Sequence, residues 1–202
     1  MKFTPLIQEL IDSFKILPGV GPKSAQRMAF QLLEQNQTGA ARLAKALQTA
    51  LSGICKCKIC RNFSEQENCP VCSELTRVES GQVCVVATPS DVLAIEETGH
   101  YHGRYFVLMG LLSPLDGVGP EELGLDLLAQ QLSAGQISEL ILATPPSIEG
   151  DATAYYITDM AKDTTAKVSQ LAQGVPMGGD ISNIDSRTLG HAFSGRKFIE
   201  QS

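Results

Sequence analysis

Cys57-Lys58-Ile59-Cys60 and Cys69-Pro70-Val71-Cys72 are the two stretches that decide how this chain of 202 residues folds. Each holds two cysteines separated by two residues, and eight residues lie between the stretches. A Cys-x-x-Cys turn directs two thiolates toward one point, so two such turns close a tetrahedron around a soft divalent ion. Four thiolates leave no position open for water, so the ion would hold structure. We therefore predict one structural zinc ion per chain, with the ligands Cys57, Cys60, Cys69 and Cys72.

The other features of the cysteines agree with a metal site in a reducing compartment. A pair of redox dithiols is the alternative, but a redox Cys-x-x-Cys opens a helix after a strand, and we expect neither stretch to do so. Cys55 is too close to Cys57 to form such a turn, and Cys84 lies in an apolar run. Neither a signal-peptide pattern nor an apolar run of membrane-spanning length is present. We expect a cytoplasmic protein without a membrane segment, in which thiols stay reduced.

Upstream of the cysteines, apolar residues recur with helical spacing in three segments. The first two segments are joined by Leu17-Pro18-Gly19-Val20-Gly21-Pro22, in which Pro22 is suited to begin a helix. The predicted inner faces hold Leu6, Ile7, Leu10, Ile11 and Phe14 in the first helix, Ala25, Met28, Ala29, Leu32 and Leu33 in the second, and Ala40, Leu43, Leu47 and Leu51 in the third.

The turn between the first two helices has the features of a phosphate contact. Gly19 and Gly21 permit a turn so tight that backbone N–H groups point outward together at a helix start, where the helix dipole favours an anion. Lys23 and Arg27 follow one helical turn apart, opposite the apolar face. This is the pattern of a helix-hairpin-helix that binds DNA without reading its sequence. An ordinary loop is the alternative; a nucleotide-binding P-loop is not, because Pro22 separates Gly21 from Lys23.

The charge distribution favours the DNA contact. Residues 1–61 hold nine Lys and Arg against three Asp and Glu, whereas the remainder holds seven against nineteen. A basic end on an acidic body attracts a polyanion. A second copy of the turn, Gly117-Val118-Gly119-Pro120, is followed by Glu121 and Glu122. Because these carboxylates repel phosphate, we predict that the second copy is a structural turn.

Strands and helices alternate after the cysteines, which predicts an α/β domain with a largely parallel sheet. The predicted strands are Val83–Ala87, Tyr105–Met109, Glu139–Thr144 and Lys167–Ala172. The predicted helices are Ser90–Thr98, Glu121–Ser133, Ala152–Ala161 and, at the end of the chain, Thr188–Ile199.

This half of the sequence offers little for catalysis. Metal-dependent phosphoryl chemistry needs carboxylates that converge from strand ends, but the first strand ends at Ala87. Glu149 and Asp151 form a single pair that could hold Mg²⁺ weakly, and the simpler interpretation is that they cap the helix beginning near Ala152. We predict no catalytic residue.

Five stretches together resemble the RecR family of bacterial recombination mediators: Leu17–Phe30, the two cysteine stretches (Cys57–Cys72), Tyr105–Pro120, Ile141–Ala154 and Gly174–Asp180. The motifs PGVGPKSAQRMAF, CKIC with CPVC, VLMGLLSPLDGVGP and EGDATAYYI carry this resemblance as a combination. It implies a helix-hairpin-helix region (1–54), a four-cysteine zinc finger (55–77), a Toprim-type α/β domain (78–175) and a C-terminal arm for oligomerisation (176–202). By motif position, the DNA contacts fall on Lys23 and Arg27.

The resemblance also implies a function. RecR-type proteins form a homo-oligomeric ring, here expected to be a tetramer, that works with RecO and RecF proteins to load recombinase on gapped or single-stranded DNA. The chain departs from the family at Ala87, where a Toprim glutamate is usual, and at Pro145, where Asn is frequent. Ala87 weakens the alternative, a metal-dependent Toprim-like nuclease or topoisomerase fragment that would use Glu149 and Asp151. We expect joints between subunits at Leu6–Phe14 and Thr188–Ile199.

Overall fold

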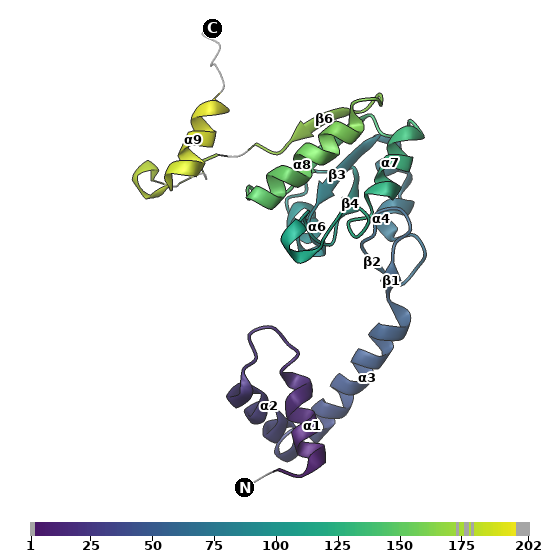
Figure 1. Cartoon of the computed structure of the whole chain (residues 1–202). Coiled ribbons are helices and arrows are strands. Elements are labelled where there is room, and N and C mark those ends of the chain that lie inside the picture. Colours follow the sequence, from purple (N-terminus) through teal and green to yellow (C-terminus); the bar gives the residue numbers. More distant parts are fainter. Residues whose placement is uncertain (1–2, 173, 176–177, 179, 197–202) are drawn as a thin grey trace. The chain divides into compact units, whose positions relative to one another are not determined.

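A computed structural model describes residues 3–172, 174–175, 178 and 180–196. The chain divides into two compact units, Met1–Ile54 and Cys55–Ser202. Figure 1 shows the first unit as a set of helices and the second as a sheet with helices around it.

The first unit is built from α1 (Pro5–Phe14), α2 (Pro22–Glu34) and α3 (Gln37–Gly53). Ala25 and Ala29 of α2 are fully buried against Ile11 of α1, because their small side chains let the two helix axes approach. A shell of larger apolar residues surrounds this contact: Ile7, Leu10, Phe14 and Val20. The side chain of Asn36 caps α3 by accepting a hydrogen bond from the N–H of Gly39 at 2.9 Å.

Each of the three predicted apolar faces has exposed residues. Leu6 at the start of α1 and Leu33 near the end of α2 are exposed, although the periodicity assigned them to the inner faces. Leu43, Leu47 and Leu51 of α3 are exposed as well, and no residue of α3 is buried. The helical periodicity of α3 was therefore predicted correctly, but its apolar stripe does not enter the core of this unit.

The second unit begins with a short hairpin and two short helices. β1 (Cys55–Lys56) pairs antiparallel with β2 (Phe63–Ser64), and α4 (Pro70–Ser73) and α5 (Leu75–Glu79) follow. Cys69 is the N-cap of α4 and Cys72 lies inside it, so the second cysteine stretch opens a short helix, contrary to the prediction. Four residues separate it from the end of β2.

The sheet that follows is entirely parallel, as the alternation of strands and helices predicted. Its strand order is β4 (Arg104–Val107), β3 (Gln82–Val86), β5 (Glu139–Ala143) and β6 (Lys167–Gln170). In register, Val85 lies beside Phe106 on one side and Leu142 on the other. β4 is therefore an edge strand, and β3 and β5 are central.

Apolar side chains cover both faces of this sheet, which explains why its strands read as continuous apolar runs. α7 (Leu125–Ser133) and α8 (Ile148–Ala161) lie side by side on one face, over Val83 and Val85 (Figure 1). α6 (Pro89–Glu97) packs on the other face, over Cys84 and Val86.

Arg77 of α5 ties the start of this unit to the sheet. Its Nη1 and Nη2 atoms donate hydrogen bonds of 2.8 Å each to the two carboxylate oxygens of Glu96 in α6. The hydroxyl of Tyr105 in β4 donates to the same carboxylate at 2.6 Å. Partial burial acts to raise the pKa of Glu96, but the hydrogen bonds from Arg77 and Tyr105 outweigh it and leave the pKa below its usual value. Glu96 is therefore held as a carboxylate between three elements.

Two helices begin four residues away from their predicted starts. α7 begins at Leu125, four residues later than predicted, because Gly124 at its N-cap has a φ of 66°, a left-handed conformation that ends the preceding turn. α8 begins at Ile148, four residues earlier than predicted, because the hydroxyl of Ser147 caps it by accepting from the N–H of Gly150 at 3.0 Å. Glu149 and Asp151 thus lie inside the first turn of α8 rather than at its cap.

The C-terminal region contains a short 3₁₀ turn (η2, Ile181–Asn183) and α9 (Ser186–Ser194). The predicted helix Thr188–Ile199 overlaps α9, and its last three residues lie outside the described residues. A further 3₁₀ turn (η1, Pro114–Asp116) precedes the second Gly-Val-Gly-Pro turn.

Candidate metal centre and nucleic-acid interface

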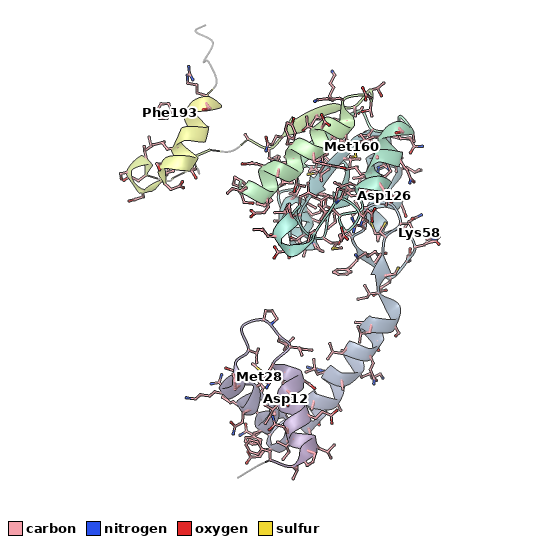
Figure 2. The ribbon with its side chains drawn as sticks, viewed as in Figure 1. Asp12, Met28, Lys58, Asp126, Met160 and Phe193 are labelled. Atoms are coloured by element: carbon pink, nitrogen blue, oxygen red, sulfur yellow. The ribbon has the colours of Figure 1, made fainter. Side chains whose placement is uncertain are left out.

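The four predicted zinc ligands come together in the structure. Their Sγ atoms lie within 4.8 Å of one another, and all four side chains are buried. The Sγ atoms of Cys60 and Cys69 are 3.6 Å apart, and the N–H of Cys69 donates to the Sγ of Cys57 at 3.3 Å. This group lies in the segment of Lys58, which is labelled in Figure 2. Its four sulfurs fit the ligand set of a structural zinc ion.

The hydrogen bonds within this group shift the pKa values of its thiols in opposite directions. Hydrogen bonds from Cys60 and Cys72 hold the pKa of Cys69 far below its usual value. The hydrogen bond to Cys69 raises the pKa of Cys60, and hydrogen bonds to Cys60 and Cys69 raise that of Cys72; burial adds to both shifts. The opposite directions of these shifts reflect the close approach of the sulfurs to one another. A bound divalent ion stabilises all of them as thiolates.

The two remaining cysteines lie outside this group. Cys55 is exposed in β1. Cys84 is buried in β3, and burial raises the pKa of its thiol to about 12. The structure therefore separates the six cysteines as the spacing predicted.

Three hydrogen bonds join the first cysteine turn to the α/β domain. The backbone N–H of Val107 in β4 donates to the carbonyl of Cys60 at 2.8 Å. The Nε2 atom of Gln131 in α7 donates to the carbonyl of Ile59 at 2.7 Å, and Nη2 of Arg61 donates to the carbonyl of Glu122 at 2.8 Å. These contacts connect residues far apart in the chain, so no local sequence pattern could reveal them. The finger is thus part of the sheet's edge rather than an appended module.

The turn before α2 has the geometry expected of an anion site. Gly19 has a φ of 77°, a conformation that a glycine adopts without strain. Gly21 is the N-cap of α2 and Pro22 its first residue, and the first turn contains no acidic residue. Within the described residues, no group accepts a hydrogen bond from the N–H of Gly21. The positive end of the helix dipole is therefore open to an anion.

Lys23 and Arg27 lie on the exposed face of α2 beside this turn. Together they line a shallow recess of about 530 Å³, with Gln26, Phe30, Gln31, Glu34 and Gln35 as the other lining residues. Neither cation has a hydrogen bond or ion pair to another residue of the described ranges. Both charges are thus available to an anionic ligand.

The second Gly-Val-Gly-Pro turn differs from the first in the hydrogen bonding of its second glycine. The Oε2 atom of Glu122 accepts a hydrogen bond from the N–H of Gly119 at 2.9 Å. This N–H group corresponds to that of Gly21 in the first copy. Because the chain's own carboxylate occupies it, the second turn cannot offer the same site to phosphate.

A recess of about 620 Å³ lies at the carboxyl ends of β3 and β5, where a Toprim-type metal site would be. Its acids are Asp91, Asp116 and Glu149. Asp91 accepts a hydrogen bond from the N–H of Thr88 at 2.7 Å, and Asp116 accepts one from the hydroxyl of Ser113 at 2.6 Å. Ala87 and Pro145 supply apolar lining, and Asp151 does not line the recess. Among the described residues, the four cysteines are the one group of His, Cys, Asp or Glu side chains placed to hold a metal ion.

We expect Cys60→Ser to lose the zinc ion and to unfold at a lower temperature than the parent protein. Structural zinc contributes about 10–16 kcal/mol in small zinc-binding peptides, and few apolar side chains pack around this group to replace it. Elemental analysis of the purified protein and a thermal melt measure the two effects.

Cys55→Ser is the matched control, because it removes a thiol two residues from a ligand. We expect it to retain one zinc ion per chain and the parent melting temperature. A zinc-free Cys55→Ser protein would show that the ligand set is wrong.

No helix of the described ranges has the length and apolar character needed to cross a bilayer.

Four family models match the chain in order: the RecR helix-hairpin-helix at residues 7–51, the RecR zinc finger domain with four cysteine ligands at 54–73, the Toprim domain at 81–172 and the RecR C-terminal region at 174–197. These matches, with the parallel sheet and the four clustered cysteines, confirm the predicted fold class and the structural zinc finger. Because the three RecR models and the Toprim model together span nearly its whole length, the chain belongs to the RecR family.

Proposed function

We propose that this protein is a non-catalytic DNA clamp of recombinational repair, which acts in the cytoplasm with RecO and RecF proteins to load recombinase on gapped or single-stranded DNA. Its RecR-family domains support the repair role. The observation that carries the DNA-binding part is the pair of unpartnered cations beside the open helix start of α2. The proposed division keeps the boundaries 1–54, 55–77, 78–175 and 176–202.

In this proposal the N–H of Gly21 and the backbone of Gly19 contact one phosphate, and Lys23 and Arg27 contact its neighbours. Contacts of this kind position a protein on DNA without reading bases. The acidic composition of the remainder of the chain supports the first unit, rather than the second, as the DNA-binding part.

The non-catalytic part of the proposal is supported by the acids of the second unit. Asp91 is engaged in the capping box at the start of α6, and Asp116 is engaged with Ser113 at the turn η1. Glu149 and Asp151 lie in the first turn of α8, where negative charge is favoured by the helix dipole. This arrangement, with Ala87 at the end of β3, does not fit a Mg²⁺ site, so we propose that the recess performs no phosphodiester chemistry.

Assembly into a ring, which we propose to be a tetramer, would overcome the weakness of a single hairpin. Non-specific DNA affinities lie at about 10⁻⁴–10⁻⁶ M at physiological salt, and several hairpins on one ring strengthen binding through multivalency. The exposed apolar stripe of α3 supports a contact between subunits, because such a stripe is normally buried. We propose that the α3 stripe forms a contact between subunits, in addition to the contacts proposed for Leu6–Phe14 and for the C-terminal arm.

We expect the double variant Lys23→Ala, Arg27→Ala to bind unrelated DNA sequences with similarly reduced affinity. The slope of log K against log salt should flatten by about 0.9 for each lost duplex phosphate contact. Arg42→Ala with Lys45→Ala is the control, because it removes the same charge from the exposed surface of α3 in the same unit. Equal losses in the two double variants would place the DNA site elsewhere.

Incubation with Mg²⁺ or Mn²⁺ and labelled single-stranded, duplex or supercoiled DNA is expected to leave the DNA intact, because the acids that line the recess do not form a described group placed to hold a metal ion. Cleavage or relaxation that disappears in Glu149→Ala would favour the nuclease or topoisomerase alternative.

We expect light scattering across a concentration series to show a homo-oligomer, with a tetramer as its largest species. A ring also predicts that circular DNA survives a salt challenge longer than linear DNA of equal length, since it has no end to slide from. A monomer at every concentration would rule out the clamp and leave a weak DNA-binding adaptor.

A further inference from the structure

A groove of about 590 Å³ lies between α7 and α8. Its floor is apolar, with Leu125 and Ala129 from α7 and Tyr156 and Met160 from α8. The members of each pair are four residues apart, so each pair forms a row along its own helix. Figure 2 labels Asp126 on α7 and Met160 on α8, the two neighbouring helices that form the groove.

The rim of this groove is acidic. Glu121, Glu122 and Asp126 line it and are exposed, and no Lys, Arg or His does. Two of these acids already have partners: Glu122 accepts from the N–H of Gly119, and Asp126, in the first turn of α7, attracts the guanidinium of Arg61. The carboxylate of Glu121 has no hydrogen bond or ion pair within the described part of the chain. Its charge is available to a ligand.

The zinc finger holds the rim in place. Arg61 donates to the carbonyl of Glu122 and lies so close to Gly124 that a Cβ atom at that position would collide with the guanidinium. The loop that carries Glu121 is therefore fixed between the finger and α7. A preformed groove lowers the ordering cost of binding.

We propose that this groove binds a protein segment that presents a Lys or Arg side chain next to an apolar one. The methylene stem of such a cation packs along apolar surface while its head stays among carboxylates. The ring of Tyr156, which is 42% exposed, offers a face to the guanidinium of an arginine. An apolar neighbour of the cation would cover Leu125 and Met160.

The charge of the groove selects this occupant over others. Three carboxylates repel the phosphates of DNA. Within the described residues, these carboxylates do not form a cluster of three or more side chains placed to hold a metal ion. The proposal concerns a protein contact and stands whether or not the α2 hairpin binds DNA.

The test uses the full-length, zinc-loaded protein and a fluorescein-labelled peptide, GRLGKLG, with GQLGQLG as the uncharged control peptide. Fluorescence anisotropy should show saturable binding of the basic peptide and none of the control. The double variant Glu121→Gln, Asp126→Asn should bind the basic peptide with about fivefold lower affinity, as expected for the loss of two exposed ion pairs.

Glu65→Gln with Glu97→Gln is the matched variant, because it removes two exposed acids outside the groove and changes the net charge equally. It should leave the affinity nearly unchanged. Ala129→Lys, which places a cation on the floor without breaking the helix, should abolish binding.

An equal loss of peptide affinity in the two acid-removing variants would overturn the proposal, because the attraction would then come from the overall charge of the protein and not from the groove. Unchanged binding to Ala129→Lys, or no binding at millimolar protein, would overturn it as well. DNA affinity, measured in parallel, should not change in the groove variants, which separates this outcome from failure of the hairpin.

Discussion

Four thiolates drawn to one zinc ion hold residues 57–72 in a shape that this segment's own packing would not maintain, since Ile59 and Val71 are the apolar side chains packed on the group. That shape places the carbonyls of Ile59 and Cys60 where α7 and β4 donate to them. It also aims Arg61 at the loop before α7. The metal thus sets the relation between the finger and the sheet, and through it the form of the groove beside α7.

The sequence was sufficient to predict features that repeat at short range. The parallel sheet and the helical faces follow from periodicity, and the metal ligands follow from cysteine spacing. The start of α7 was missed because Glu121 and Glu122 resemble a first helical turn, and only the backbone of Gly124 shows that they precede it. Leu6 was assigned to the core in error, because periodicity identifies the apolar face of a helix but not which residues of that face are covered by other helices.

Long-range contacts could not be predicted in the same way. Gln131, Arg61 and Arg77 are ordinary polar residues in the sequence, and their roles depend on partners brought close by the fold. The two Gly-Val-Gly-Pro turns differ instead through a neighbouring residue in the sequence, which determines whether a backbone N–H group is left open. Both turns expose backbone N–H groups, and the carboxylate of Glu122, two residues beyond the second turn, neutralises one of them.

The hydrogen bond from Val107 to Cys60 has a consequence for the chain before it acquires its metal. β4 is an edge strand, and its sequence Tyr105-Phe106-Val107 is strongly apolar. Unpaired edges of this kind are templates on which a second chain adds its own strand, the first step of aggregation. The cysteine turn occupies one donor of this edge, the N–H of Val107, and it does so only while its shape is held. A bound metal would therefore protect this edge donor as well as stabilise the finger.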